Sequence, residues 1–123
     1  MTHPIRVLLA EDDSVNAMVV TAMLEKLGCR VEAVVDGQSA VDRGVGELDL
    51  CILDARMPVL DGFDAARALR ALPGGLAIPI VGLTADDTDA VHRRALDAGM
   101  DEVLTKPVSV DVLEALLKRR VRA

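Results

Sequence analysis

The chain has 123 residues, a net charge of −6, and a composition that is 51% hydrophobic and 28% charged. This length and balance predict one globular domain, spanning residues 1–123, with a hydrophobic core of its own. The acidic charge argues against a nucleic-acid-binding surface, which needs clustered Lys and Arg. Phe63 is the only aromatic residue, so we expect an aliphatic core and no recognition of bases by stacking.

The sequence also bears on location. No stretch approaches the ~18 apolar residues of a membrane span, and the N-terminus lacks a signal-peptide pattern. We therefore expect a cytoplasmic protein, or the cytoplasmic part of a membrane-anchored one, with no membrane contact by this domain. Cys29 and Cys51 lie among apolar residues without metal-binding spacing, which predicts buried, reduced thiols.

Apolar runs and helical patterns alternate through the first half of the chain. A continuous apolar run predicts a buried strand at residues 5–10. Asp13 or Ser14 can cap the helix that follows, and Gly28 ends it. The apolar residues that recur at helical spacing in this helix are Val15, Met18, Val19, Ala22, Met23 and Leu27. A second strand is expected at 30–35, a short helix at 38–45 and a third strand at 48–53.

The same alternation continues after Asp54. The patterns predict a helix at 63–72, a strand at 78–83, a helix at 86–98, a short strand at 102–105 and a last helix from Ser109 to about Val121. Strand and helix therefore alternate five times with short links. This predicts an α/β fold, with a doubly wound, parallel five-stranded sheet covered by helices on both faces. Periodicity alone does not choose the strand order.

Polar side chains follow four of the five strands, where each strand ends. Glu11 and Asp12 follow the first, Asp54 the third, Thr84 the fourth and Lys106 the fifth. Because the carboxyl ends of parallel strands meet at one edge, we expect these groups to converge there. Each residue alone has an ordinary explanation as a turn, cap or solvated charge, but their common position favours a functional site.

This set of groups suits phosphoryl transfer. Clustered carboxylates need a cation between them, and hard oxygen ligands favour Mg²⁺. An Asp can act as a nucleophile toward phosphorus, a Lys can pair with phosphate, and a Thr hydroxyl can donate to it. The chain has no glycine-rich phosphate-binding loop, so the phosphoryl group is expected to come from another molecule. His3 and His92 are expected to be solvated.

Four motifs together resemble the receiver domain of two-component response regulators. They are residues 7–16 (VLLAEDDSVN), 53–62 (LDARMPVLDG), 83–85 (LTA) and 104–107 (LTKP), and they span essentially the whole chain. The resemblance implies a (βα)5 fold with the flavodoxin-like strand order 2-1-3-4-5. Asn16 and residues 98–101 (AGMD) are most similar to receivers of hybrid sensor histidine kinases.

The resemblance also implies roles for individual residues. Asp54 is the phosphoacceptor, Thr84 the switch hydroxyl and Lys106 the phosphate counter-ion. Glu11, Asp12, Asp54 and the backbone carbonyl of Arg56 are the Mg²⁺ ligands, with Glu11 acting through water. The Lys106–Pro107 bond is expected to be cis. The implied partner is a histidine kinase or a histidine phosphotransfer protein, and homodimerisation through the fourth and fifth helices is a further expectation.

Two positions, Val103 and Arg56, matter for how this chain compares with the family. Val103 stands where many receivers carry Tyr or Phe, so switching through an aromatic ring is not expected. Arg56 lies two residues after Asp54, and we hypothesise that it screens the phosphate and changes the dephosphorylation rate. Two alternatives remain open. An Asp-nucleophile phosphohydrolase needs a second Asp where Arg56 stands, and a non-phosphorylated pseudo-receiver does not need the five polar residues. The leading prediction is a phosphoacceptor domain without substrate turnover of its own.

Overall fold

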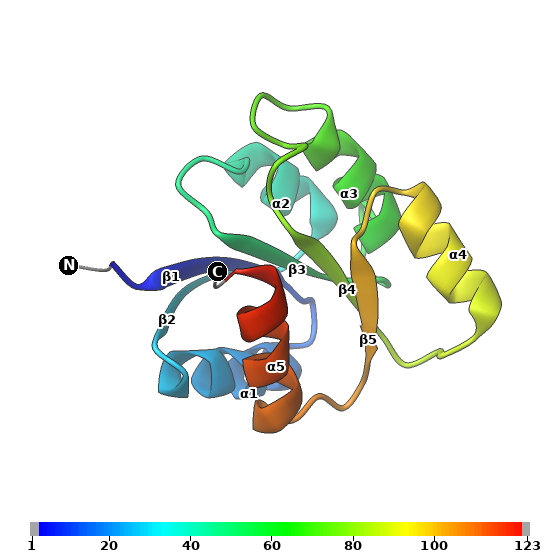
Figure 1. The fold of residues 1–123 in the computed structure, drawn as a ribbon. Coiled ribbons are helices and arrows are strands. Elements are labelled where there is room, and N and C mark those ends of the chain that lie inside the picture. The colour runs from blue at the N-terminus through cyan, green and yellow to red at the C-terminus, as the bar shows by residue number, and fades with distance from the viewer. Residues whose placement is uncertain (1–2, 122–123) are drawn as a thin grey trace.

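The computed structural model describes residues 3–121. Strands and helices alternate along them (Figure 1). They are β1 (Ile5–Ala10), α1 (Ser14–Lys26), β2 (Cys29–Val34), α2 (Gly37–Arg43), β3 (Leu50–Asp54), α3 (Gly62–Arg70), β4 (Ile80–Thr84), α4 (Asp89–Asp97), β5 (Glu102–Thr105) and α5 (Val110–Arg120). The first and last two residues of the predicted domain lie outside the described part.

The strands form one parallel sheet in the order β2-β1-β3-β4-β5. This confirms the expected fold class and the order that the resemblance implies. The register pairs Ala10 with Leu53, and Asp54 with Leu83. The end of β3 therefore lies between the ends of β1 and β4, and all strand ends point to the same edge.

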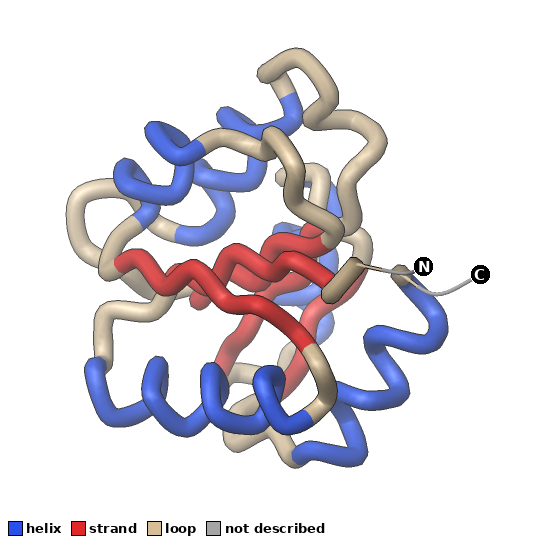
Figure 2. The backbone as a smooth tube through the Cα atoms, turned by 90° about the vertical axis from the view of Figure 1, so that its left-hand side faces the viewer, coloured by secondary structure: helices blue, strands red, loops and turns tan. Residues whose placement is uncertain are grey.

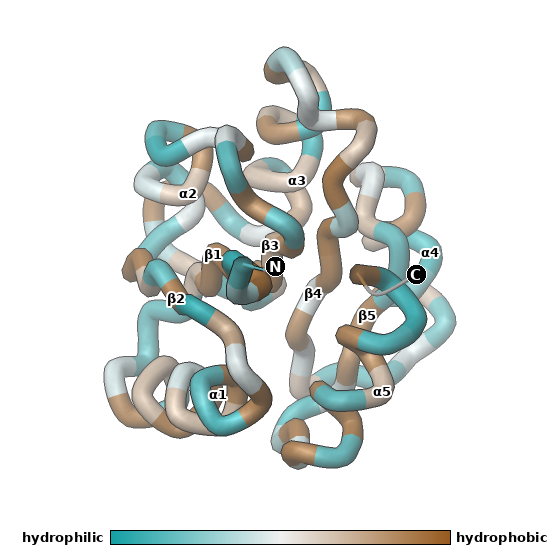
Figure 3. Tube along the Cα trace, turned by 60° about the vertical axis from the view of Figure 1, so that its left-hand side comes forward, coloured by the Kyte–Doolittle hydropathy of each residue, from teal (hydrophilic) through white to brown (hydrophobic). Residues whose placement is uncertain are grey.

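The sheet is the middle of three layers (Figure 2). Alternate residues of each strand point to opposite faces. Leu8 and Ala10 belong to the hydrophobic cluster that includes residues of α2, α3 and α4, whereas Val7 and Leu9 belong to the one that includes residues of α1 and α5. In Figure 3 strand β4 has mostly hydrophobic colours, while the outer helices mix both kinds of residue. Each helix thus covers the sheet with one side and meets solvent with the other.

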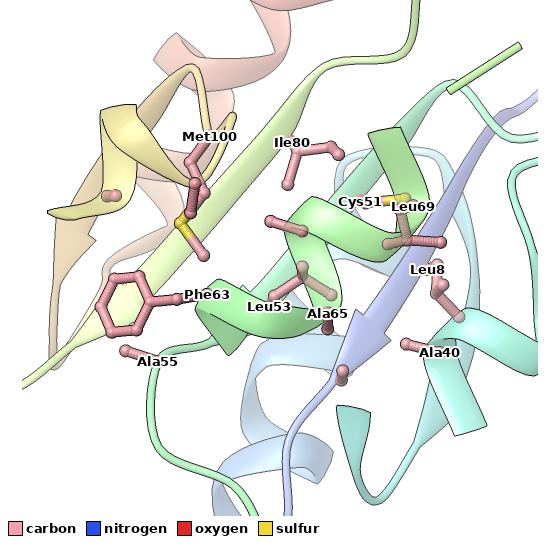
Figure 4. Packing of buried hydrophobic residues seen from close by; sticks show 14 of the residues in the cluster. Leu8, Ala40, Cys51, Leu53, Ala55, Phe63, Ala65, Leu69, Ile80 and Met100 are labelled. Carbon is pink, nitrogen blue, oxygen red and sulfur yellow. The ribbon is translucent and has the colours of Figure 1, made fainter. Parts of the chain in front are cut away.

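The core is aliphatic, as the composition predicts. On the side of α2, α3 and α4 it contains the single aromatic ring, Phe63, which is buried at one end of the cluster near Ala55 (Figure 4). Cys29 and Cys51 are both buried, and burial raises the pKa of the Cys51 thiol to about 12. Between residues 3 and 121, the structure has no helix long and apolar enough to cross a membrane.

Apart from shifts of one or two residues at other element boundaries, two sequence predictions differ from the structure. Helix α4 begins at Asp89 instead of residue 86, because Thr88 caps it and residues 85–88 form a loop. In α1 the apolar spacing was misleading: Val20 and Leu24 are buried, whereas Val15 and Met18 are 68% and 70% exposed. Apolar residues occupy most of the circumference of this helix, so periodicity did not distinguish its inner face.

Candidate functional site

The five polar residues predicted to converge do so. Glu11, Asp12, Asp54, Thr84 and Lys106 line one cleft at the carboxyl edge of the sheet, with a volume of about 460 Å³. The cleft is also lined by Asp13, Arg56, Ala85 and Asp86. Its walls are the loops that follow β1, β3, β4 and β5. Parallel strand order alone brings together residues up to 95 positions apart.

Asp54 is the central carboxylate. It is the last residue of β3 and only 4% exposed. Its Oδ2 accepts a hydrogen bond from Lys106 Nζ at 2.7 Å, and its Oδ1 accepts one from the Arg56 backbone amide at 3.2 Å. These two donors fix the carboxylate at the mouth of the cleft. The Arg56 side chain is exposed.

Glu11 is the more deeply buried partner, at 1% exposure. Its Oε1 accepts hydrogen bonds from Lys106 Nζ at 3.0 Å and from the side-chain amide of Asn16. Burial, together with the neighbouring Asp54 carboxylate, raises the pKa of Glu11 above its ordinary value. In the folded protein, both desolvation and a nearby like charge therefore disfavour the ionised form of Glu11.

Lys106 is the only ammonium in contact with these two carboxylates among the described residues. Burial lowers its pKa, but the hydrogen bonds to Asp54 and Glu11 outweigh burial, so the pKa of Lys106 is raised. The Lys106–Pro107 peptide that follows is cis. One cation thus faces two buried anions, which leaves the cleft with an excess of negative charge.

Three carboxylates are close enough to share a metal ion. Glu11, Asp12 and Asp54 each offer an oxygen, and these oxygens lie within 4.8 Å of one another. An all-oxygen set of this kind, open to water on one side, fits a hard divalent cation such as Mg²⁺. The Arg56 carbonyl as a further ligand stays a prediction.

Thr84 closes the cleft on the side of β4. Its hydroxyl donates to the Asp86 carbonyl at 3.3 Å and accepts from the Asp86 amide at 3.0 Å. The hydroxyl is therefore held by the loop of residues 85–88 that leads to α4. Any group that competes for this hydroxyl would release one end of that loop.

The loop from Ala55 to Asp61 connects Asp54 to α3. Asp61 caps α3 by accepting from the Asp64 amide at 2.9 Å. A Cβ atom on Gly62 would collide with the Asp54 carbonyl oxygen, so only glycine allows this close approach. Within the loop, Val59 has a φ of 70° and the Leu60 amide donates to the Pro58 carbonyl at 2.8 Å, which is a γ-turn. A β-branched residue is strained in this conformation.

Two contacts link the end of this loop and the start of α3 to α4. The Arg94 guanidinium lies 4.2 Å from the centre of the Phe63 ring, and its Nη2 lies 3.4 Å from Asp61. Val103, the position at which the sequence lacks an aromatic residue, is half-buried against the hydrophobic cluster that contains Phe63. His92 is half-exposed and pairs with Asp87 at 2.6 Å, so it is not simply solvated.

Sequence reasoning missed the part that Asn16 plays, since this residue was noticed only as a mark of resemblance. It is the third residue of α1, after the capping residue Asp13. Side chains at this helix position can reach back past the cap. The sequence signal for this contact was an amide side chain at this helix position, five residues after Glu11, the acidic residue that follows β1.

Comparisons with known proteins agree with this geometry. Residues 7–118 match the family model described as the response regulator receiver domain. The aerobic respiration control sensor protein ArcB of Escherichia coli is 39% identical over 117 residues, covering 94% of this chain and 15% of ArcB. The chain spans between 7% and 15% of the length of the first curated relatives it matches.

Solved structures show the same fold. The receiver domain of the sensor histidine kinase PA1611 from Pseudomonas aeruginosa, with a magnesium ion coordinated in its active-site cleft, matches with a TM-score of 0.90 and 39% identity. The match covers 98% of this chain and 99% of that one. A chain in the co-crystal structure of the Saccharomyces cerevisiae histidine phosphotransfer protein Ypd1 with the receiver domain of Ssk1 matches with a TM-score of 0.88 and 29% identity, covering 98% and 91%. The chain therefore belongs to the response regulator receiver domain family of two-component signalling proteins.

Proposed function

We propose that Asp54 accepts a phosphoryl group from a phosphohistidine, and that Glu11, Asp12, Thr84, Lys106 and the Arg56 carbonyl assist. The observation that carries this proposal is the buried Asp54 carboxylate with Lys106 Nζ 2.7 Å away and two further carboxylates around it. In the transfer, an Asp54 oxygen forms a bond to phosphorus while the bond from phosphorus to the donor nitrogen breaks. Lys106 is then placed to pair with the phosphoryl oxygens.

Mg²⁺ is the proposed cofactor, held by Glu11, Asp12 and Asp54. When bound, it supplies positive charge between the carboxylates and the incoming phosphoryl oxygens. The chain itself holds the acceptor in place through Lys106 and the Arg56 amide. The Thr84 hydroxyl would exchange its contact with Asp86 for a phosphoryl oxygen, which frees the loop toward α4. We expect the exposed Arg56 side chain to screen the phosphoryl group and change how fast it is lost.

The proposed partner is a histidine kinase or a histidine phosphotransfer domain. Helix α1 begins beside the cleft and presents exposed apolar side chains, including Val15, Met18 and Val19, which would suit contact with such a partner. Homodimerisation through α4 and α5 stays a prediction, supported by the exposed Leu96 and Val112 on these helices. A cytoplasmic location, the absence of nucleic-acid binding and the extent of the domain over 1–123 stay predictions from the sequence.

Acetyl phosphate or phosphoramidate, with Mg²⁺, tests the proposal directly. We expect intact-mass spectrometry to show reversible addition of one phosphoryl group to the wild-type protein. Asp54→Asn should show none, because the amide cannot act as the nucleophile. The matched control is Asp64→Asn, which changes an exposed carboxylate ten positions further along and should leave the addition intact.

The other readings give different results in the same experiment. Sustained phosphate release over many turnovers would favour an Asp-nucleophile phosphohydrolase over a domain without turnover of its own. Absence of any adduct on the wild-type protein would favour a pseudo-receiver. Omitting Mg²⁺ should strongly slow the addition, and equal rates with and without it would contradict the cofactor.

A further inference from the structure

We propose that Asn16 is a positioning residue that leaves Glu11 with one oxygen free and thereby makes the cleft select Mg²⁺ over Ca²⁺. This inference rests on the proposed function, because it concerns the metal that this function requires. According to this proposal, the three carboxylates alone do not determine which cation the cleft binds, and a residue of α1 is needed as well.

The position of Asn16 is fixed by its helix. Its backbone amide donates to Oδ1 of the capping residue Asp13 at 2.9 Å, and its side-chain amide donates to Glu11 Oε1. The backbone contact anchors the first turn of α1, so the side-chain amide has little freedom to leave Glu11. Asn16 is half-buried, which limits competition from water.

The two oxygens of Glu11 are therefore unequal. Oε1 is engaged twice, by Asn16 and by Lys106 Nζ at 3.0 Å. Oε2 has only a long contact with the Asp13 amide, at 3.5 Å. Oε2 is thus the oxygen that remains for a metal ion or for a water molecule bound to it.

This inequality matters for cation choice. Ca²⁺ takes six to eight oxygen ligands and often binds a carboxylate through both oxygens, whereas Mg²⁺ needs near-octahedral geometry and keeps several waters. A Glu11 with one blocked oxygen cannot chelate in the two-oxygen mode. It suits the ion that takes one oxygen per carboxylate.

Of the two donors on Oε1, Asn16 is the constant one. Lys106 Nζ also contacts Asp54 Oδ2, at 2.7 Å, and a phosphoryl group on Asp54 would compete for it. Lysine is a mobile point charge, while the asparagine amide is a planar group on a short side chain. Loss of Asn16 should therefore let Glu11 rotate and offer both oxygens.

Titrations of the backbone amide resonances with MgCl₂ and with CaCl₂, at constant ionic strength, measure the two dissociation constants. The variants are Asn16→Ala and Asn16→Leu, the second of which fills the same space without a donor. The matched control is Gln38→Ala, which removes an amide-to-carboxylate contact of 2.9 Å with Asp42 on the exposed side of α2.

In both Asn16 variants we expect Mg²⁺ affinity to fall about tenfold, as for other groups that orient a metal ligand. Ca²⁺ affinity should fall less, so that the preference for Mg²⁺ falls by at least about twofold. The Gln38 control should keep the wild-type preference. If thermal stability in EDTA falls while the preference changes by less than about twofold in both variants, Asn16 is only structural and the inference is overturned.

The phosphorylation assay separates the two proposals. A wild-type protein that accepts a phosphoryl group while the Asn16 variants keep its cation preference leaves the proposed function standing and removes this inference. A wild-type protein that neither binds Mg²⁺ nor accepts a phosphoryl group overturns both.

Discussion

The two ends of the sheet can be compared through the charges that each one buries. At the start of β4 and β5, the Arg70 guanidinium donates to the carbonyls of Gly75, Ile78 and Gly99 at 2.6–2.7 Å and to Asp101 at 3.0 Å. Asp101 in turn accepts from the Ile80 amide at 2.8 Å. One cation meets one anion, and the remaining donors meet backbone carbonyls.

At the carboxyl end the charges do not balance. Glu11 and Asp54 share Lys106, and the γ-turn at Val59 adds backbone strain a few residues away. The difference indicates that the Arg70 end is built for stability, whereas the Asp54 end gives up stability in a way that suits the cation and phosphoryl binding proposed for it. Substitutions at the two ends should therefore have effects of opposite sign.

The largest effect on stability is expected at the Arg70 end of the sheet. Arg70→Ala should lower the free energy of unfolding by about 3 kcal/mol, because it removes the cation that pairs with a half-buried carboxylate and the donor to three backbone carbonyls. Urea unfolding measures this. Arg67→Ala, which removes an exposed pair with Asp64 one turn earlier, should cost less than about 0.5 kcal/mol. Equal effects of the two substitutions would mean that the Arg70 end is not specially stabilised.

Neutralising Glu11 should have the opposite sign. The raised pKa of Glu11 means that the folded state disfavours its charge. Its contribution to stability is present below the ordinary pKa and is lost as the pH rises through the folded value. Glu11→Gln should therefore raise the free energy of unfolding at neutral pH in EDTA, by about 1 kcal/mol.

Mg²⁺ gives the contrast for this variant. It should stabilise the wild-type protein through binding to the folded state and stabilise Glu11→Gln less. Glu114→Gln, on the exposed side of α5, serves as the control and should respond to Mg²⁺ as the wild type does. A loss of stability in Glu11→Gln in EDTA would show that the carboxylates are not in conflict.

The third prediction concerns removal of the backbone strain in the γ-turn at Val59. Val59→Gly should stabilise the protein by about 1 kcal/mol or somewhat less, because glycine adopts positive φ without strain but adds freedom to the unfolded chain. Val35→Gly is the matched control, since Val35 is also exposed but has no positive φ. It should destabilise. Thermal unfolding of both variants distinguishes strain from a general effect of glycine.

The smallest effect concerns how the free energy of unfolding depends on pH at the Arg70 end of the sheet. Hydrogen bonds from Arg119 and Arg120 outweigh burial and hold the pKa of Glu102 below its ordinary value of 4.5. Its stabilising contribution is thus complete above pH 4.5 and is lost as the pH falls through the folded pKa. Glu102→Gln should cost less than about 1 kcal/mol at neutral pH, because the arginines are partly exposed. The gap between variant and wild type in urea unfolding should close in acid, and a constant gap would contradict this assignment.

The strand ends could be predicted from the sequence because they combine a long apolar run with an abrupt polar stop. This is why Glu11, Asp54, Thr84 and Lys106 were found before their contacts were known. Arg70 could not be predicted in this way. Its partners are mostly backbone carbonyls, which any residue supplies, and they lie up to 31 positions away. The inner face of α1 was missed for another reason, since apolar residues on both sides of the helix give no contrast.

Phe63 has a practical consequence for spectroscopy. As the single aromatic residue of the chain, it is buried beneath Arg94, at the start of the helix to which the loop after Asp54 leads. A protein made with fluorophenylalanine would carry one fluorine label, with no background from other rings. Its resonance would report on the contact between α3 and α4 beside the loop after Asp54, so the proposed addition of a phosphoryl group to Asp54 could be followed in real time by a single line.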